Sequence, residues 1–141
     1  MLEAMLRGLV IERSAIRHGM AWCIQRSAAS DEIVETLAGS LTLLQTPVPK
    51  KIARLFLVSD ILHNAGVSKA VPRADSYKVR LQRVLPDIFA SLHVSYAALE
   101  SRMALETMRD QVAKVLYIWQ AWSLFPLSFT TRLERAFLHG A

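Results

Sequence analysis

The sequence predicts an all-α protein. Apolar residues recur with helical spacing along the whole chain. No run of β-branched residues alternates with a period of two, and no Asn-Gly or Asp-Gly pair indicates a β-hairpin. The breaks between helical segments are short, so consecutive helices are expected to pack as antiparallel pairs that stack like a short solenoid of about seven or eight helices.

Apolar stripes predict four helices in the first half of the chain, over residues 1–12, 15–28, 31–44 and 50–64. Ser14 and Ser30 are expected to cap the second and third of these helices, because serine side chains accept hydrogen bonds from free backbone N–H groups. Prolines in the segment QTPVP separate the third helix from the fourth. Gly66 is expected to end the fourth helix.

The second half predicts helices over residues 76–96, 101–122 and 128–138. A loop, GVSKAVPRA, comes before them, and Asp75 is expected to cap the first. Pro86 either kinks that helix or restarts it. Residues 101–122 form one or two helices, and Pro126 marks the break before the last one.

Length and composition indicate a single domain over residues 1–141 that needs no metal or disulfide to hold its core. The lone cysteine, Cys23, has apolar neighbours and is expected to be buried, which fits a reducing compartment. No apolar run is long enough to span a bilayer. The net charge of +5 favours an anionic partner, although a solvated basic face would account for it equally well.

One carboxylate stands out in the fourth predicted helix. Apolar residues cover most of that helix, which predicts a central position packed on several sides. Asp60 lies in the middle, with Phe56 and Asn64 one turn away on the same face and His63 beside them. A buried, unpaired carboxylate is costly. Asp60 therefore either pairs internally with Arg54, His63 or a distant lysine, or faces solvent at an edge, or lines a groove and accepts a ligand's hydrogen bond.

The segment PKKIARLFLVSDILHNA resembles the fourth-helix signature of the CTD-interacting domain family. The segment AKVLYIWQAWSLFP resembles the penultimate-helix motif of that family, a basic residue followed by apolar residues and a tryptophan. ERSAIRHGMAWC also fits its second helix. The resemblance covers residues 13–138 and is strongest to the branch found in SURP-motif splicing-associated proteins, including plant splicing regulators.

This resemblance implies a right-handed superhelical stack of about eight helices, similar to VHS and ENTH domains. It also implies a partner, because family members bind the Tyr-Ser-Pro-Thr-Ser-Pro-Ser repeats of the large RNA polymerase II subunit's tail. The peptide would lie between the second, fourth and seventh family helices. Asp60 would accept a hydrogen bond from the heptad tyrosine, Asn64 would bond the peptide backbone, and Phe56 would form part of an apolar wall.

The chain departs from the family pattern at three positions. Phe56 stands in place of a tyrosine, and Ser59 in place of the asparagine before the aspartate. Lys114 stands where several members use an arginine to grip a phosphoserine, and lysine offers a point charge rather than a bidentate fork. Lys114 either contacts that phosphate or forms a surface pair with Asp110. Ile118, one turn on, would form the apolar side of the same pocket.

A second anion site is expected at the start of the second helix. Free backbone N–H groups and the helix dipole favour phosphate there, and some family members use a serine and an arginine with the spacing of Ser14 and Arg17. The alternative is that Ser14 is an ordinary helix N-cap and that Arg17 is simply an exposed arginine. The expected phosphate-binding side chains are therefore Lys114, Ser14 and Arg17. The expected peptide-binding side chains are Phe56, Ser59, Asp60, His63, Asn64 and Ile118.

No catalytic constellation, metal-ligand spacing or glycine-rich phosphate loop is found in the sequence, so neither an enzyme nor a cofactor is expected. Trp119, Trp122 and Phe125 are expected in the core. The resemblance implies a monomeric nuclear adaptor, excised from a longer protein, that binds phosphorylated heptads and couples transcription to splicing. RNA and splicing factors would be further partners through the longer protein. The alternative is an RNA- or protein-binding helical scaffold that has weakened or lost tail recognition, and a VHS/ENTH-like membrane or cargo role ranks third.

Overall fold

The structure is a computed structural model that describes residues 1–68 and 70–140. These residues form no strand, which confirms the all-α prediction. The helices are α1 (Leu2–Gly8), α2 (Arg13–Gln25), the 3₁₀ helix η1 (Ser27–Ala29), α3 (Ser30–Thr42), α4 (Val48–Val67), α5 (Ser76–Ala97), α6 (Arg102–Ala121) and α7 (Leu127–His139). The predicted helical stack of about eight members is therefore present, with seven α-helices and η1 in the described part of the chain.

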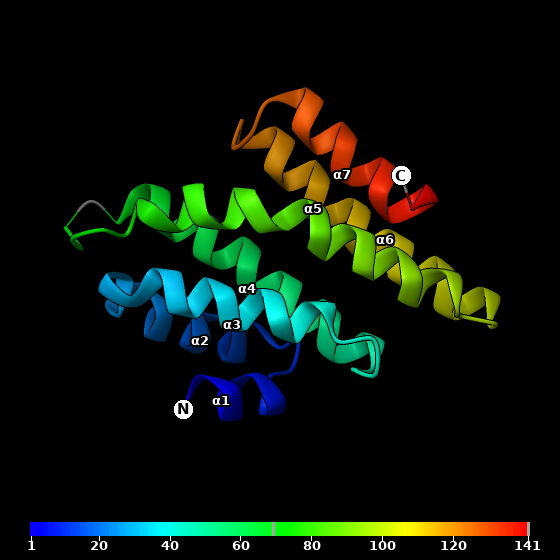
Figure 1. Cartoon of the computed structure of the whole chain (residues 1–141), viewed down its shortest axis with the longest axis horizontal. Helices are drawn as coiled ribbons and strands as arrows, with labels where there is room; N and C mark the ends of the chain where they lie inside the picture. The colour runs from blue at the N-terminus through cyan, green and yellow to red at the C-terminus, as the bar shows by residue number, and fades with distance from the viewer. Residues whose placement is uncertain (69, 141) are drawn as a thin grey trace.

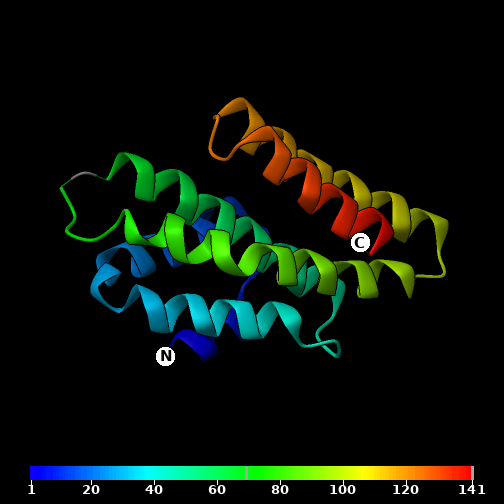
Figure 2. The ribbon, with the colours of Figure 1, turned by 45° about the horizontal axis from the view of Figure 1, so that its top comes forward.

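The helices stack in two layers. The odd-numbered helices α1, α3, α5 and α7 pack in sequence along one layer, and α2, α4 and α6 pack along the other. Figures 1 and 2 show the stack running from α1 at the N-terminus to α7 at the C-terminus, on the opposite side of the molecule. Each short connection therefore carries the chain from one layer to the other, as expected for stacked antiparallel pairs.

The fourth helix, α4, is the centre of the stack. It packs against α2, α3, α5 and α6, as its nearly continuous apolar surface predicted. The approach of α2 is close at Gly19, where an added Cβ would lie 3.2 Å from Leu57 Cδ1. This contact joins the middle of α2 to the middle of α4.

Several predicted helix ends are wrong by a few residues. The first helix ends at Gly8, so residues 9–12 form a connection rather than its last turn. Glu12 is the N-cap of α2, and Ser14 lies inside the first turn instead of capping it. Ala29 occupies the cap position of α3, and Ser30 instead shares a hydrogen bond with Ser76, with 2.7 Å between their hydroxyl oxygens.

Proline and glycine were less disruptive than their propensities suggested. The fourth helix begins at Val48, because Pro49 fits in a first turn where its missing N–H is not needed. It continues through Gly66 to Val67, and α5 continues through Pro86 without a break. Asp75 occupies the cap position of α5 without a side-chain capping bond. Lys69, in the predicted loop, lies outside the described residues.

A single apolar core fills the space between the layers. Cys23 is fully buried, as predicted, and burial raises the pKa of its thiol to about 12. Trp119 and Phe125 are also buried, but Trp122 is 41% exposed, so the prediction that it belongs to the core is wrong. Among the described residues, no helix combines the length and the apolarity that a membrane crossing requires.

Candidate functional site

A recess of about 450 Å³ lies between the start of α2, the middle of α4 and the second half of α6. It brings together six of the side chains predicted from the sequence, which are Phe56, Ser59, Asp60, His63, Lys114 and Ile118. Its remaining lining residues are Ile11, Arg13, Ile16, Val115 and Trp122. We call this the Asp60 recess.

Helical periodicity explains why these residues share a surface. On α4, Phe56, Ser59 and His63 recur at three- and four-residue intervals, which places them on one face with Asp60. On α6, Lys114 and Ile118 are four residues apart and lie on one face for the same reason. Because α2 and α6 both pack on α4, α4 forms the floor of the recess and the other two helices flank it.

Asp60 is the buried charge of this recess. The residue is only 7% exposed, and its Oδ1 forms an ion pair with Nη1 of Arg13, with 3.0 Å between the two atoms. Its Oδ2 is buried and has no hydrogen-bond partner among the residues that the structure describes. A carboxylate oxygen without a donor in a protein interior is costly, so the carboxylate retains an unmet capacity to accept a hydrogen bond.

The partner of Asp60 was not among those considered from the sequence. Arg54, one of the three, donates instead to the main-chain carbonyls of Leu6 and Ser40. The Arg13 side chain is 62% exposed, so the ion pair lies at the surface of the recess and is not sealed inside the core.

Two cations flank the carboxylate. Arg13 belongs to the first turn of α2, and Lys114 belongs to α6. The alternative pairing of Lys114 with Asp110 is not formed, since neither residue takes part in an ion pair within the described chain. Lys114 is therefore an exposed positive charge beside a largely apolar recess, which favours an anionic group on a ligand.

Ser59 joins the floor of the recess to its wall. The indole Nε1–H of Trp119 donates a hydrogen bond to Ser59 Oγ at 3.0 Å. Trp119 is fully buried, so this bond satisfies its one polar group and fixes the spacing of α4 and α6. The Ser59 hydroxyl keeps its own proton for donation.

An aromatic pair closes one end of the recess. The rings of His63 and Trp122 have centroids 4.3 Å apart and planes tilted by 33°. Trp122 was predicted to be core because it follows Trp119 by three residues. It lies instead at the C-cap of α6, where the helix ends, and it lines the recess. The sequence did contain a signal for this exposure, because the Phe-Pro pair that follows Trp122 indicates that α6 ends there.

Three predicted site residues do not line the recess. Asn64 is half-buried, and its Nδ2 donates to the main-chain oxygen of Asp60 at 2.9 Å. Ser14 and Arg17 are exposed on α2, outside the lining. Their binding roles remain predictions. In the described part of the chain, no three side chains of metal-binding type gather where they could hold an ion.

Comparisons with known proteins place the whole chain in one family of domains. A model described as CID domain matches residues 1–133. The chain is 42% identical over 138 residues to "Protein RRC1-like" and 41% identical over 138 residues to "Protein RRC1", both from Arabidopsis thaliana. These matches cover 98% of this chain but only 14% of either relative, so the chain corresponds to a small part of much longer proteins.

Proposed function

Because this chain belongs to the CID domain family, we propose that it is a non-catalytic adaptor that binds the heptad-repeat tail of RNA polymerase II. The observation that supports this most is the carboxylate of Asp60, which lines an open recess and has one buried oxygen without a hydrogen-bond partner among the described residues. A tyrosine hydroxyl is a neutral donor of suitable reach, and it would satisfy that oxygen without bringing a second negative charge.

The walls of the Asp60 recess suit the rest of a tyrosine side chain. Phe56, Ile16 and Ile118 supply apolar surface around the carboxylate. An aromatic ring that enters such a recess gains from burial of its apolar area, and its polar tip reaches a hydrogen-bond acceptor. The missing hydroxyl at Phe56 removes one polar contact but leaves this wall intact.

Phosphate on the tail would bind at the cations. Lys114 lies on the rim of the recess next to Ile118, one turn along the same helix. An ammonium attracts phosphate without the bidentate geometry of arginine, so we expect phosphorylation to raise affinity by a modest factor. Ser14 and Arg17 are close in sequence to Arg13 and are proposed as the second phosphate contact.

The biological role proposed for the domain is to couple transcription to pre-mRNA splicing in the nucleus, as a monomeric part of a longer protein. Binding is expected to be weak, about micromolar or poorer, because a short flexible peptide buries little surface and must order itself on binding. Weak contacts of this kind suit a long repetitive partner that offers many copies of the same motif.

A titration of the domain with two-repeat peptides, bare and phosphorylated, tests the proposal. Backbone amide chemical shifts around Asp60, Phe56 and Ile118 are expected to move with at least one phosphorylated form. If no form shifts these signals, and the domain instead binds RNA with a steep salt dependence, the alternative of a nucleic-acid-binding scaffold replaces tail recognition.

A further inference from the structure

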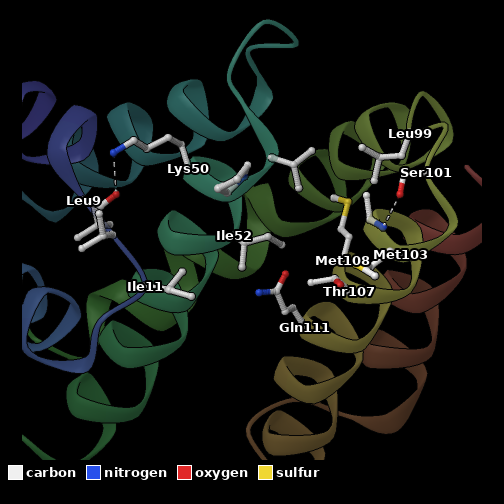
Figure 3. A pocket seen from close by; sticks show the side chains of 14 residues that line it. Leu9, Ile11, Lys50, Ile52, Leu99, Ser101, Met103, Thr107, Met108 and Gln111 are labelled. Atoms are coloured by element: carbon white, nitrogen blue, oxygen red, sulfur yellow. Dashed lines mark hydrogen bonds between the residues drawn. The ribbon is translucent and has the colours of Figure 1, made fainter.

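A second recess, larger than the first, lies at the amino-terminal ends of α4 and α6. Its volume is about 610 Å³, and it is bounded by the α1–α2 connection, the start of α4 and the first turns of α6 (Figure 3). Its surface is almost entirely apolar, with Ile52 and Met108 lining it from the core. At its edge, Ile11 is 51% exposed and Met103 is 77% exposed. Large apolar side chains left open in this way mark a surface suited to a partner.

The polar groups of this second recess are mostly engaged within the chain. Lys50 Nζ donates to the main-chain oxygen of Leu9 at 3.1 Å, and Ser101 Oγ accepts from the Ala104 amide at 3.3 Å (Figure 3). The side-chain amide of Gln111 points into the space between α4 and α6 (Figure 3). The second recess therefore suits an uncharged apolar group whose backbone meets an amide, and Lys50, the cation among its described lining residues, is already bonded to the Leu9 carbonyl.

The two recesses are consecutive parts of one groove. Ile11 lines both of them. Along α4 the lining passes from Ile52 to Phe56, and along α6 it passes from Gln111 to Lys114. Their lining residues are centred about ten residues apart on each helix, which corresponds to ~15 Å at the rise of an α-helix. An extended peptide covers that distance in about four to five residues.

We propose that the second recess binds an apolar side chain of the same tail peptide, four or five residues away from the tyrosine that contacts Asp60. This inference rests on the proposed function. In the repeated heptad a proline occurs five residues before and five residues after each tyrosine, so a peptide running in either direction presents one. The Gln111 amide bonds a main-chain carbonyl of the peptide, and the proline ring packs against Ile52 and Met108.

The test uses the intact 141-residue domain and an unphosphorylated two-repeat peptide. Thr107, an exposed residue of α6 that lines the second recess, is replaced by tryptophan to fill it. The matched control is Glu106→Trp, an exposed neighbour on α6 outside the lining. Asp60→Ala reports on the first recess. A second variant, Met103→Glu, alters the edge without adding bulk, and far-UV circular dichroism checks the fold of each variant.

The expected result is that Thr107→Trp and Met103→Glu weaken binding by at least five-fold and that Glu106→Trp leaves it unchanged. A peptide with alanine at the prolines five residues before and five residues after the central tyrosine should bind the parent domain more weakly and show no further loss with Thr107→Trp. Affinities of Thr107→Trp and Met103→Glu equal to the parent, with binding lost in Asp60→Ala, overturn this inference and leave the proposed function standing. Absence of binding by the parent domain overturns both. A dimer in sedimentation that Thr107→Trp abolishes assigns the recess to a second copy of the chain, which also overturns the inference.

Discussion

Two stretches of α4 carry buried charge, and they differ in where that charge finds its partners. Near the start of the helix, Lys51 Nζ donates to Ser95 Oγ at 2.8 Å. The Arg54 guanidinium donates from Nε and Nη2 to the Leu6 carbonyl at 3.3 and 3.1 Å, and from Nη1 to the Ser40 carbonyl at 3.1 Å. These partners come from α1, α3 and α5, so this stretch ties the layers together.

The middle of the same helix is different. Asp60 has one partner, the exposed Arg13, and one oxygen with none in the described chain. A buried group whose hydrogen bonds are all made inside the protein acts on stability, whereas a group left partly unsatisfied beside a recess is available to a ligand. On this one helix, Lys51 and Arg54 therefore form a polar cluster that stabilises the fold, whereas Asp60 belongs to a site that can bind a ligand. Mutations at these residues can test that difference.

The largest effect is expected on stability, at Arg54. Replacing Arg54 with alanine removes the guanidinium that donates to the carbonyls of Leu6 and Ser40, and it opens space in the core. The free energy of unfolding should fall by about 3 kcal/mol in chemical denaturation. The affinity of the remaining folded domain for the tail peptide should change by less than about two-fold. Unaltered stability would show that these bonds contribute little.

The next largest effect is expected on binding, at Asp60. Replacement by alanine removes the acceptor proposed for the tyrosine hydroxyl, so peptide affinity should fall about ten- to thirty-fold, or about 1.4 to 2 kcal/mol, by calorimetry. Stability should change by less than about 1 kcal/mol, because half of the carboxylate has no partner to lose. Asp110→Ala, an exposed carboxylate on α6 away from the recess, is the matched control. If Asp60→Ala lowered the free energy of unfolding as much as Arg54→Ala does, Asp60 would instead act mainly on the stability of the fold.

Lys51 is expected to make the stability of the fold depend on pH. Its side chain is fully buried, and burial together with the nearby Arg54 charge lowers its pKa below the usual 10.5. The cost of burying the charged form is therefore present below the folded-state pKa and disappears as the pH rises from that pKa towards 10.5. Lys51→Met should stabilise the fold by about 1 kcal/mol at pH 7, and this gain should shrink at alkaline pH.

Unfolding titrations of the parent and Lys51→Met at the same pH values provide the measurement. The raised pKa values of Cys23 and Tyr77 act equally in both proteins, so they cancel in the difference. If the stability gained by Lys51→Met did not depend on pH, the gain would come from packing and not from removal of the buried charge, which would contradict the prediction.

The smallest effect is expected at Lys114. Lys114→Gln should weaken binding of the phosphorylated peptide by about two- to five-fold and leave the bare peptide unaffected, because an exposed charge contributes little in water. Lys114→Arg should restore or exceed the parent affinity, since arginine adds a bidentate contact. The difference should diminish in high salt. Equal effects on both peptides would show that Lys114 does not contact the phosphate.

The α4 helix shows which features of the fold and the site could be predicted from the sequence. Its apolar circumference predicted its central position, and the spacing of Phe56, Asp60 and His63 predicted that they share a face. Its ends were wrong because Pro49 and Gly66 were given their average effects, whereas packing on four neighbouring helices overrides those local preferences.

Contacts between distant segments were harder to predict. Nothing local in the sequence pairs Arg13 with Asp60, because that contact depends on how closely α2 approaches α4 at Gly19. The second recess was missed for the same reason, since three separate segments form it. The exposure of Trp122 depends on the place where α6 ends, and helix ends are the least predictable part of a helical fold.

A double-mutant cycle between the domain and its peptide tests the central claim most directly. It combines Asp60→Ala with a two-repeat peptide in which the central tyrosine is replaced by phenylalanine. If the tyrosine hydroxyl donates to this carboxylate, the peptide change should weaken binding about ten-fold in the parent domain and have almost no effect in Asp60→Ala. An equal loss in both proteins would show that the hydroxyl and the carboxylate do not meet, and the account of the Asp60 recess would be contradicted.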